Sequence, residues 1–383
     1  MARLEEICSL ITDGSHFSPE DEGVGYPMFS VKDMTPNGFN ISGCKKIGEE
    51  AYKKLVANGC KPLNDDVVVA KDGSYLKTAF VIKGNPEIAL LSSIAILRPQ
   101  IDLVVPEYLS YFLKSDAVYR TVSLNYITGT ALKRIILKGI RKIEVDLPDI
   151  GEQEQRAQRL SKVDYLCQLR KQQLAKLDEL VKARFVEMFE NSSWPNTSLN
   201  DICSEIVDCP HSTPKYEGNL EHPAIRTTEI KKGYIDWDSM KYVSEEEYQK
   251  RIKSLKPVPG DIVYGREGTY GNAAIIPDGY EFCLGQRVML FRPNKTKCIS
   301  AYVLYAILSD HVKRQADEKN VGATVPHVNV ADAKQFDVVL PPLSIQNQFA
   351  AFVERVDQQK QTVQKSLEKL ELMKKALMQE YFG

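Results

Sequence analysis

The residues of this chain best suited to chemistry are a cation and an aromatic ring in each of two matched glycine loops. The loops read Lys71-Asp72-Gly73-Ser74-Tyr75 and Arg266-Glu267-Gly268-Thr269-Tyr270, and each follows a short apolar run rich in β-branched residues. A loop of this kind can bring a cation and an aromatic ring close to a phosphate or to a base edge. We therefore take Lys71, Tyr75, Arg266 and Tyr270 as candidate nucleic-acid contacts.

A basic tract between residues 133 and 142 is a second candidate surface. Five cations fall within it, beside apolar isoleucines. The matching stretch later in the chain, VPHVNVADAK, is nearly neutral and carries His327. Two surfaces that read different nucleic-acid sequences would differ in this way, but a solvated edge explains the tract equally well. The candidate contacts here are Lys133, Arg134 and His327.

Two further strand-like runs, residues 27–34 and 224–230, supply additional candidates near their ends. These are Lys32 in the first run and Arg226 and Thr228 in the second. His16 and His211 lie in matched loops that also contain Ser and Pro. For both histidines we favour a hydrogen-bonded loop position over a base contact.

The sequence repeats itself at long range. Residues 129–148 read GTALKRIILKGIRKIEVDLP, and residues 322–341 read GATVPHVNVADAKQFDVVLP. The same offset carries Glu187 onto Glu380 and Phe189 onto Phe382. Solenoid repeats run roughly 20–50 residues, which is far shorter than this period. The pattern therefore predicts a duplicated domain, whose copies can place two similar surfaces about a pseudo-twofold axis.

Each copy ends in a predicted long amphipathic helix, over residues 152–189 and 345–382. At about 1.5 Å per residue each arm is ~57 Å long. A single apolar stripe on such a helix requires a partner. We predict that this partner is the other arm, so that the two arms form an antiparallel coiled coil. The alternative is that each arm packs on its own domain. The predicted seam consists of Leu160, Val163, Leu174, Leu177 and Val181 in the first arm and Val356, Val363, Leu367, Leu370 and Leu377 in the second.

Short β-branched runs mixed with helical stretches predict a mixed α/β (α+β) fold with a curved sheet in each copy. Their order does not match a doubly wound sheet. The predicted boundaries are residues 1–150 for the first domain and 151–191 for its helix. The second domain is predicted at residues 192–343, and its helix at 344–383.

The usual sequence signatures of catalysis are missing. The chain has no GxxxxGK[ST] phosphate loop and no GxSxG nucleophile elbow. Its five histidines form no HExxH pattern, so we expect no metal. The [DN]PP[YFW] loop with which an amino-methyltransferase holds its target base is also missing. These observations predict a non-catalytic protein without a cofactor of its own.

Composition predicts a soluble cytoplasmic protein. The eight cysteines form no CxxC pair, which favours reduced thiols, and the opening MARLEEICSL does not resemble a signal peptide. No apolar stretch approaches the ~20 residues needed to cross a membrane. Lys and Arg total 50 against 51 Asp and Glu, so any DNA surface must be a local concentration of cations.

Several motifs, taken in order, carry a resemblance to a known family. They are Ile11-Thr12-Asp13-Gly14-Ser15-His16-Phe17-Ser18-Pro19 with its echo Asp208-Cys209-Pro210-His211-Ser212-Thr213-Pro214, then Asp33-Met34 before Asn37-Gly38, then Gly260-Asp261-Ile262-Val263-Tyr264-Gly265-Arg266-Glu267-Gly268, and finally Leu340-Pro341-Pro342-Leu343 before Gln346 and Gln348. Over its whole length the chain resembles the DNA-specificity subunit of type I restriction–modification systems. The first copy departs from the pattern in having Asn64-Asp65-Asp66 for Gly-Asp and Lys71 for the loop arginine.

The resemblance implies two target-recognition domains, each reading one half of a bipartite, asymmetric site in double-stranded DNA. It implies that the helical arms form an antiparallel coiled coil whose length sets the gap between the halves. It also implies two methyltransferase subunits, which bring S-adenosylmethionine, and restriction subunits, which bring ATP and magnesium. The alternative is a pseudo-dimeric scaffold that gathers two partner proteins without contacting DNA. The target sequence cannot be derived from these residues.

Overall fold

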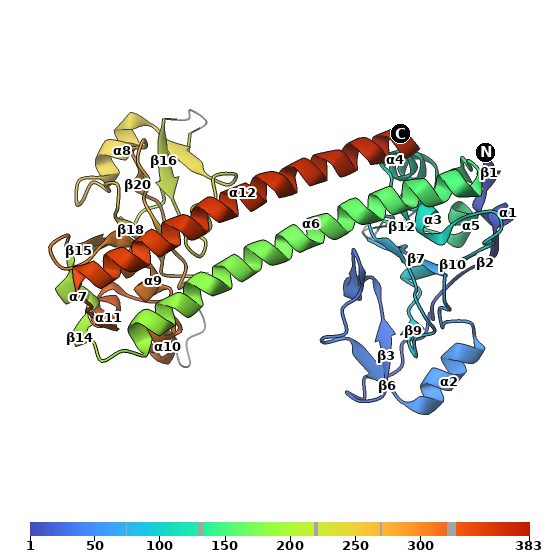
Figure 1. The fold of residues 1–383 in the computed structure, drawn as a ribbon, viewed down its shortest axis with the longest axis horizontal. Coiled ribbons are helices and arrows are strands. Elements are labelled where there is room, and N and C mark those ends of the chain that lie inside the picture. Colours follow the sequence, from blue (N-terminus) through green and yellow to red (C-terminus); the bar gives the residue numbers. More distant parts are fainter. Residues whose placement is uncertain (74, 129–132, 218–220, 269, 320–326) are drawn as a thin grey trace. The chain divides into compact units, whose positions relative to one another are not determined.

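The computed structural model describes residues 1–73, 75–128, 133–217, 221–268, 270–319 and 327–383. They form two compact units, one made of residues 1–171 with 365–383 and the other of residues 172–364 (Figure 1). Each helical arm is therefore divided between the units, whereas the predicted boundaries 1–150, 151–191, 192–343 and 344–383 follow chain order. Parts of the sequence repeat, residues 129–132 and 322–326, lie outside the described residues.

The body of the first unit is built on a four-stranded antiparallel sheet in the order β2-β10-β7-β8. Its inner strand β7 reads Val-Val-Val-Ala and is buried at every position, which suits β-branched side chains. The strands are β2 (Cys8–Asp13), β7 (Val67–Ala70), β8 (Ala79–Val81) and β10 (Ile94–Pro99).

Smaller elements complete the first unit. A three-stranded sheet has the order β6-β3-β9, and three two-stranded pairs join β1 to β13, β4 to β5 and β11 to β12. Helix α3 lies against β7 and β8, and α2 lies against β9. The bounds are β1 (Ala2–Arg3), α1 (Leu4–Ile7), β3 (Tyr26–Phe29), η1 (Val31–Asp33), β4 (Met34–Thr35), β5 (Gly38–Phe39), β6 (Lys45–Ile47), α2 (Glu49–Ala57), β9 (Ala89–Leu90), α3 (Pro106–Leu113), α4 (Asp116–Asn125), β11 (Ile127–Thr128), β12 (Arg134–Ile135), α5 (Leu137–Arg141) and β13 (Glu144–Val145).

The second unit repeats this topology. Its four-stranded sheet has the order β15-β21-β18-β19, and its three-stranded sheet has the order β17-β16-β20. The bounds are β14 (Asn196–Ser198), α7 (Leu199–Ile202), β15 (Cys203–Asp208), β16 (His222–Ile225), β17 (Lys241–Val243), α8 (Glu245–Arg251), β18 (Ile262–Gly265), β19 (Ala273–Ile275), β20 (Cys283–Leu284), β21 (Val288–Pro293), α9 (Ser300–Ile307), α10 (Asp310–Lys319), α11 (Val330–Lys334) and β22 (Asp337–Val339).

The predicted mixed α/β fold and the internal duplication are confirmed, down to a local irregularity. The pairing of β10 with β2 shifts register between Arg98 and Pro99, and the pairing of β21 with β15 shifts at Cys203–Glu205, the corresponding place. The strand-like runs 27–34 and 224–230 were predicted too long. Strands β3 and β16 end at Phe29 and Ile225, because the residues that follow close a turn.

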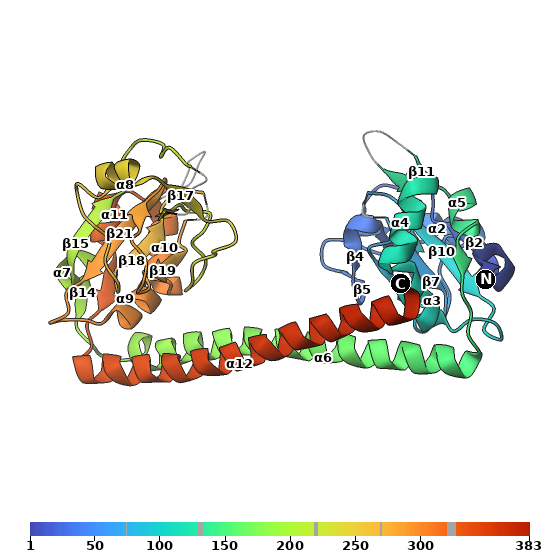
Figure 2. The ribbon, with the colours of Figure 1, turned by 90° about the horizontal axis from the view of Figure 1, so that it is seen from above.

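The arms are helices α6 (Ile150–Phe185), which continues as a π-helical turn at Val186–Glu190, and α12 (Leu343–Phe382). In the first unit, α6 positions 156, 164 and 170 contact α12 positions 381, 374 and 366 respectively. The second unit pairs Asp178 with Lys360 at 2.6 Å. Within each unit the two helices lie side by side in opposite directions, which confirms the antiparallel pairing (Figure 2).

The predicted seam positions differ in burial. Leu160, Val163, Val181, Val356, Val363 and Leu367 are buried, and Leu174, Leu177, Leu370 and Leu377 are half-buried. Each arm also embeds its last aromatic ring in a domain core. The ring of Phe382 lies 5.1 Å from that of Tyr108, and the ring of Phe189 lies 5.0 Å from that of Tyr302. Within the described residues, no helix is both long and apolar enough to cross a membrane.

Candidate nucleic-acid interface

An ion pair and an exposed histidine lie together at one end of the first unit's main sheet, where strands β2 and β7 finish. Strands β2 and β7 both run antiparallel to β10, so their last residues reach the same edge. Asp13 ends β2, and Lys71 follows β7 and donates to the Asp13 carboxylate. Lys71 is only 7% exposed. His16 Nε2 lies 3.6 Å from Asp13 Oδ2, and the histidine side chain is 78% exposed.

The second unit builds the same cluster from different residues. Asp208 ends β15, and Arg266 follows β18 and places Nη1 3.0 Å from Asp208 Oδ2. His211 Nε2 lies 3.7 Å from the same oxygen, and its side chain is 79% exposed. Each unit therefore holds an aspartate between an inner cation and an outer histidine. We call these two clusters the Asp–cation–His clusters.

Each histidine sits on a loop that a further cation holds in place. In the first unit Lys45 Nζ donates to Ser18 Oγ and to the carbonyl of Pro19, both at 2.7 Å. In the second unit the buried Arg251 donates to the carbonyl and the hydroxyl of Ser212. The cation that holds the loop comes from β6 in the first unit and from α8 in the second. The two loops are therefore held in place by different contacts.

Backbone pairing brings the basic tract beside the glycine loop. Asp72 forms an antiparallel bridge with Arg134, and the Gly73 N–H donates to the Lys133 carbonyl at 2.9 Å. Lys133 and Arg134 are exposed there. In the second unit Glu267 forms the corresponding bridge with His327. The basic tract therefore lies next to the Asp–cation–His cluster of the first unit. Arg134 and His327 occupy equivalent positions in the two units.

Each loop tyrosine hydrogen-bonds a residue of a neighbouring helix. Tyr75 is 4% exposed, hydrogen-bonds Ser123 of α4 at 3.0 Å, and stacks on Tyr119. Tyr270 donates to Asp317 of α10, and this hydrogen bond raises the pKa of Tyr270. The two rings anchor their loops to corresponding helices, which leaves the buried Tyr75 ring without a face for a base to stack on.

The turns after β3 and β16 adjoin the same edge. Ser93, which precedes β10, accepts from the Val31 N–H through its hydroxyl and from the Lys71 N–H through its carbonyl. Lys32 is exposed on this turn. In the second unit Arg226 closes onto Glu229, and Thr228 Oγ1 donates to the same carboxylate at 2.7 Å.

Asp13 and Asp208 were not among the site residues predicted from the sequence. Each aspartate is half-buried and pairs with a cation 58 residues away, and this pairing is a property of the sheet. A signal was available, because the spacing from aspartate to histidine is the same in both copies. Among the described residues no group of His, Cys, Asp and Glu side chains could hold a metal ion.

Comparison with known families identifies the fold that carries this interface. The profile of the type I restriction modification DNA specificity domain matches residues 1–179 and again residues 191–372. The chain belongs to this family. The double match confirms the resemblance drawn from the sequence motifs. Family membership supports a role in DNA sequence specificity without catalysis, and does not favour the scaffold alternative.

Two relatives come from Methanocaldococcus jannaschii. The specificity subunit of type I restriction enzyme MjaVIII is 23% identical over 348 residues, which cover 85% of this chain and 79% of the relative. The putative MjaX specificity subunit is 29% identical over 196 residues, which cover 49% of this chain and 45% of the relative.

Solved structures share the architecture. The S subunit of a type I restriction–modification system from M. genitalium has a TM-score of 0.56 at 15% identity, covering all of this chain and 95% of its own. A chain from a structural study of type I R-M complex assembly and conformational transition has a TM-score of 0.55 at 16% identity, covering all of this chain and 96% of its own. At these identities the likeness supports the fold alone.

Proposed function

We propose that this chain is the DNA-reading subunit of a type I restriction–modification system and recognises a bipartite, asymmetric target. The observation that carries the proposal is the pair of Asp–cation–His clusters, each bordered by exposed residues that differ between the units. A single subunit that reads two different half-sites needs a shared way to hold DNA and a separate way to read each half.

We assign the holding of DNA to residues that are the same in both units, and the reading of sequence to residues that differ between them. Phosphate contacts position a protein on DNA without reading sequence, whereas base-edge contacts specify it. His16 and His211 are equivalent and exposed, so they suit contacts to the phosphate backbone. Arg134 and His327 are equivalent in place but differ in chemistry, so they suit base reading in the two halves. Lys71 and Arg266 act indirectly, by holding the aspartates.

The helical arms suit a spacer between the two half-sites. Helix α6 has 36 residues and is ~54 Å long at about 1.5 Å per residue. Half-sites one DNA turn apart lie roughly 34–36 Å from centre to centre. We propose that the paired arms set this spacing and dock two methyltransferase subunits. In this arrangement S-adenosylmethionine, ATP and magnesium are bound by the methyltransferase and restriction subunits, and the complex acts in the cytoplasm.

Exchange of one domain tests the proposal. Residues 1–150 are replaced by the matching domain of a relative with a different target, and the complex is expressed with its methyltransferase subunits. Modified-base sequencing of the host DNA should show a new sequence in one half of the methylated motif and no change in the other. A motif that changed in both halves, or in neither, would contradict the assignment of one half-site to each domain.

The scaffold alternative makes a different prediction. A scaffold leaves the choice of motif to its partners, so the exchange would leave methylation unchanged. Gel shifts of the complex on duplexes with one half-site scrambled provide the second readout, because a DNA-reading subunit should lose affinity for either scrambled duplex.

A further inference from the structure

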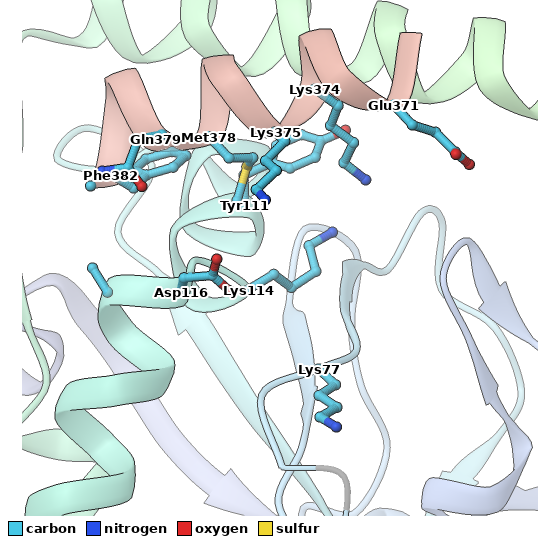
Figure 3. A pocket seen from close by; sticks show the side chains of 12 residues that line it. Lys77, Tyr111, Lys114, Asp116, Glu371, Lys374, Lys375, Met378, Gln379 and Phe382 are labelled. Atoms are coloured by element: carbon cyan, nitrogen blue, oxygen red, sulfur yellow. The ribbon is translucent and has the colours of Figure 1, made fainter. Parts of the chain in front are cut away.

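An open pocket of about 350 Å³ lies in the first unit, where α3 and α4 meet the end of α12 (Figure 3). Four lysines line it: Lys77, Lys114, Lys374 and Lys375. Figure 3 shows Lys374 and Lys375 extending from α12 on one side and Lys114 from the end of α3 on the other. The volume is at the lower end of the ~300–1,000 Å³ of small-molecule sites.

Lys114 has no carboxylate partner among the described residues. Its ammonium lies 4.5 Å from the centre of the Tyr111 ring. The nearby carboxylate of Asp164 is already occupied, because it accepts from the Tyr111 hydroxyl at 2.9 Å and pairs with Lys374. Burial, reinforced by Lys374, lowers the pKa of Lys114 to about 8. A cation held in this way gains from an anion that enters the pocket.

The carboxylates that line the pocket do not balance its lysines. Glu371 pairs with Lys171 at 3.0 Å. Asp116 is exposed at the first turn of α4. Within the described residues, no carboxylate forms an ion pair with Lys77 or Lys375 to neutralise its charge. The pocket therefore has an excess of positive charge supplied by elements far apart in the sequence.

The wall formed by α3, α4 and α12 lies away from the proposed DNA surface, whereas Lys77 borders that surface because it follows Tyr75 of the glycine loop by two residues. The wall includes the start of α4, whereas the far end of the same helix leads to β11 and the basic tract. Ten residues of helix span ~15 Å. Two of its lysines are not repeated in the second unit, since the positions that correspond to Lys114 and Lys374 are Leu308 and Val181. Lys114 and Lys374 are therefore not part of the duplicated Asp–cation–His clusters.

We propose that this pocket binds a small phosphate-bearing molecule, which bridges α3 and α12 and fastens the end of the second arm to the first unit. Two ammoniums from different elements, Lys114 and Lys374, suit a dianionic phosphate group. Tyr111, Met378 and Phe382 supply an apolar wall beside them. Because the ligand contacts both elements at once, its binding favours the docked arm over a released one.

Pyrophosphate is the probe for the test, titrated into the full-length protein with calorimetry and thermal unfolding as readouts. The variant is Lys114→Leu, which copies the residue that the second unit tolerates at the matching position. The control is Lys295→Leu, an exposed lysine of the second unit. Wild type and control should bind pyrophosphate and gain thermal stability, and Lys114→Leu should lose at least tenfold in affinity.

Three results would overturn the proposal. The first is that neither phosphate, pyrophosphate nor ATP binds at millimolar concentration. The second is that the probe binds Lys114→Leu as well as wild type. The third is that Lys114→Leu weakens binding of duplex DNA or of a methyltransferase subunit while pyrophosphate has no effect, which would assign the lysines to a DNA backbone or to an acidic protein segment. Failure of the DNA-reading proposal alone would leave pyrophosphate binding intact.

Discussion

Gln153 joins the first arm to its domain through the backbone of Val105, whose N–H donates to Gln153 Oε1 at 2.9 Å. The amide nitrogen of the same side chain donates to the carbonyls of Leu103 and Pro148. Gln346 makes the corresponding three hydrogen bonds at the start of the second arm. Both glutamines are buried, so each arm leaves its domain at an angle fixed by a fully satisfied amide.

The first prediction concerns this joint. Gln153→Leu removes the partners of the Val105 N–H and of the Leu103 and Pro148 carbonyls, which are partly buried, and an unsatisfied buried group costs about 1–3 kcal/mol. We expect a loss of about 2–4 kcal/mol in the free energy of unfolding, measured by urea denaturation. Gln155→Leu, at an exposed position of the same helix, is the control and should change stability little. Equal stability of the two variants would show that the joint is not fixed by this amide.

The second prediction concerns the inner cation of the first cluster. Lys71→Met strands a carboxylate that is only 12% exposed, and breaking a buried ion pair costs about 3–5 kcal/mol. Lys71→Arg should be tolerated, because Arg266 fills the corresponding place in the second unit. Denaturant unfolding of both variants checks the prediction. If Lys71→Met were as stable as Lys71→Arg, the pair would not support the sheet edge.

The third prediction concerns the exposed histidines. His16→Ala and His211→Ala each remove a polar contact with about 1 kcal/mol of binding free energy, so affinity for DNA should fall about fivefold per substitution. The loss should be the same on specific and scrambled duplexes, and the methylated motif should stay unchanged. Fluorescence anisotropy at fixed salt concentration measures the affinity. A motif relaxed in one half would instead identify that histidine as a base contact.

The fourth prediction separates the two half-sites. Arg134→Ala should weaken discrimination in the first half by about 1–3 kcal/mol and leave the second half unaffected, and His327→Ala should do the reverse. Methylation rates on duplexes with single base changes provide the measurement. Lys138→Ala, an exposed change elsewhere in the basic tract, is the comparison for a general loss of positive charge.

The fifth prediction follows from the lowered pKa of Lys114, which is about 8. Burial lowers this pKa most and the charge of Lys374 lowers it further, whereas Asp164 raises it. Between pH 8 and the usual lysine value near 10.5, the unfolded chain binds more protons than the folded one, so stability rises with pH. In phosphate-free buffer, Lys114→Leu should therefore be more stable than wild type by about 1–3 kcal/mol below pH ~8. The advantage should shrink as the pH rises toward 10.5.

Thermal and denaturant unfolding across that pH range measure the effect. Lys295→Leu, which removes an exposed lysine of the second unit, is the control. If the stability difference between Lys114→Leu and wild type did not vary with pH, folding would not lower the pKa of Lys114.

Local and periodic features of the chain were predictable from the sequence. The repeat that carries Phe189 onto Phe382 predicts duplicated topology, because sequences that match in order form elements that match in order. Apolar spacing at Leu160, Val163 and Val181 predicts long helices with one buried stripe, because that spacing follows the helical turn. The glycine loops after buried strands were likewise predictable from β-branched runs and turn residues.

Tertiary structure alone decided which of the candidate residues lie together and which of them face solvent. Strands β2 and β7 end at one edge because both flank β10, and this brings Asp13 to Lys71 and leaves His16 outside. Tyr75 turns inward because α4 offers it Ser123 and Tyr119, a helix that no local pattern places over the loop. Sequence spacing records distance along the chain, whereas ion pairing, burial and the lysine pocket depend on strand order and on arms shared between two units.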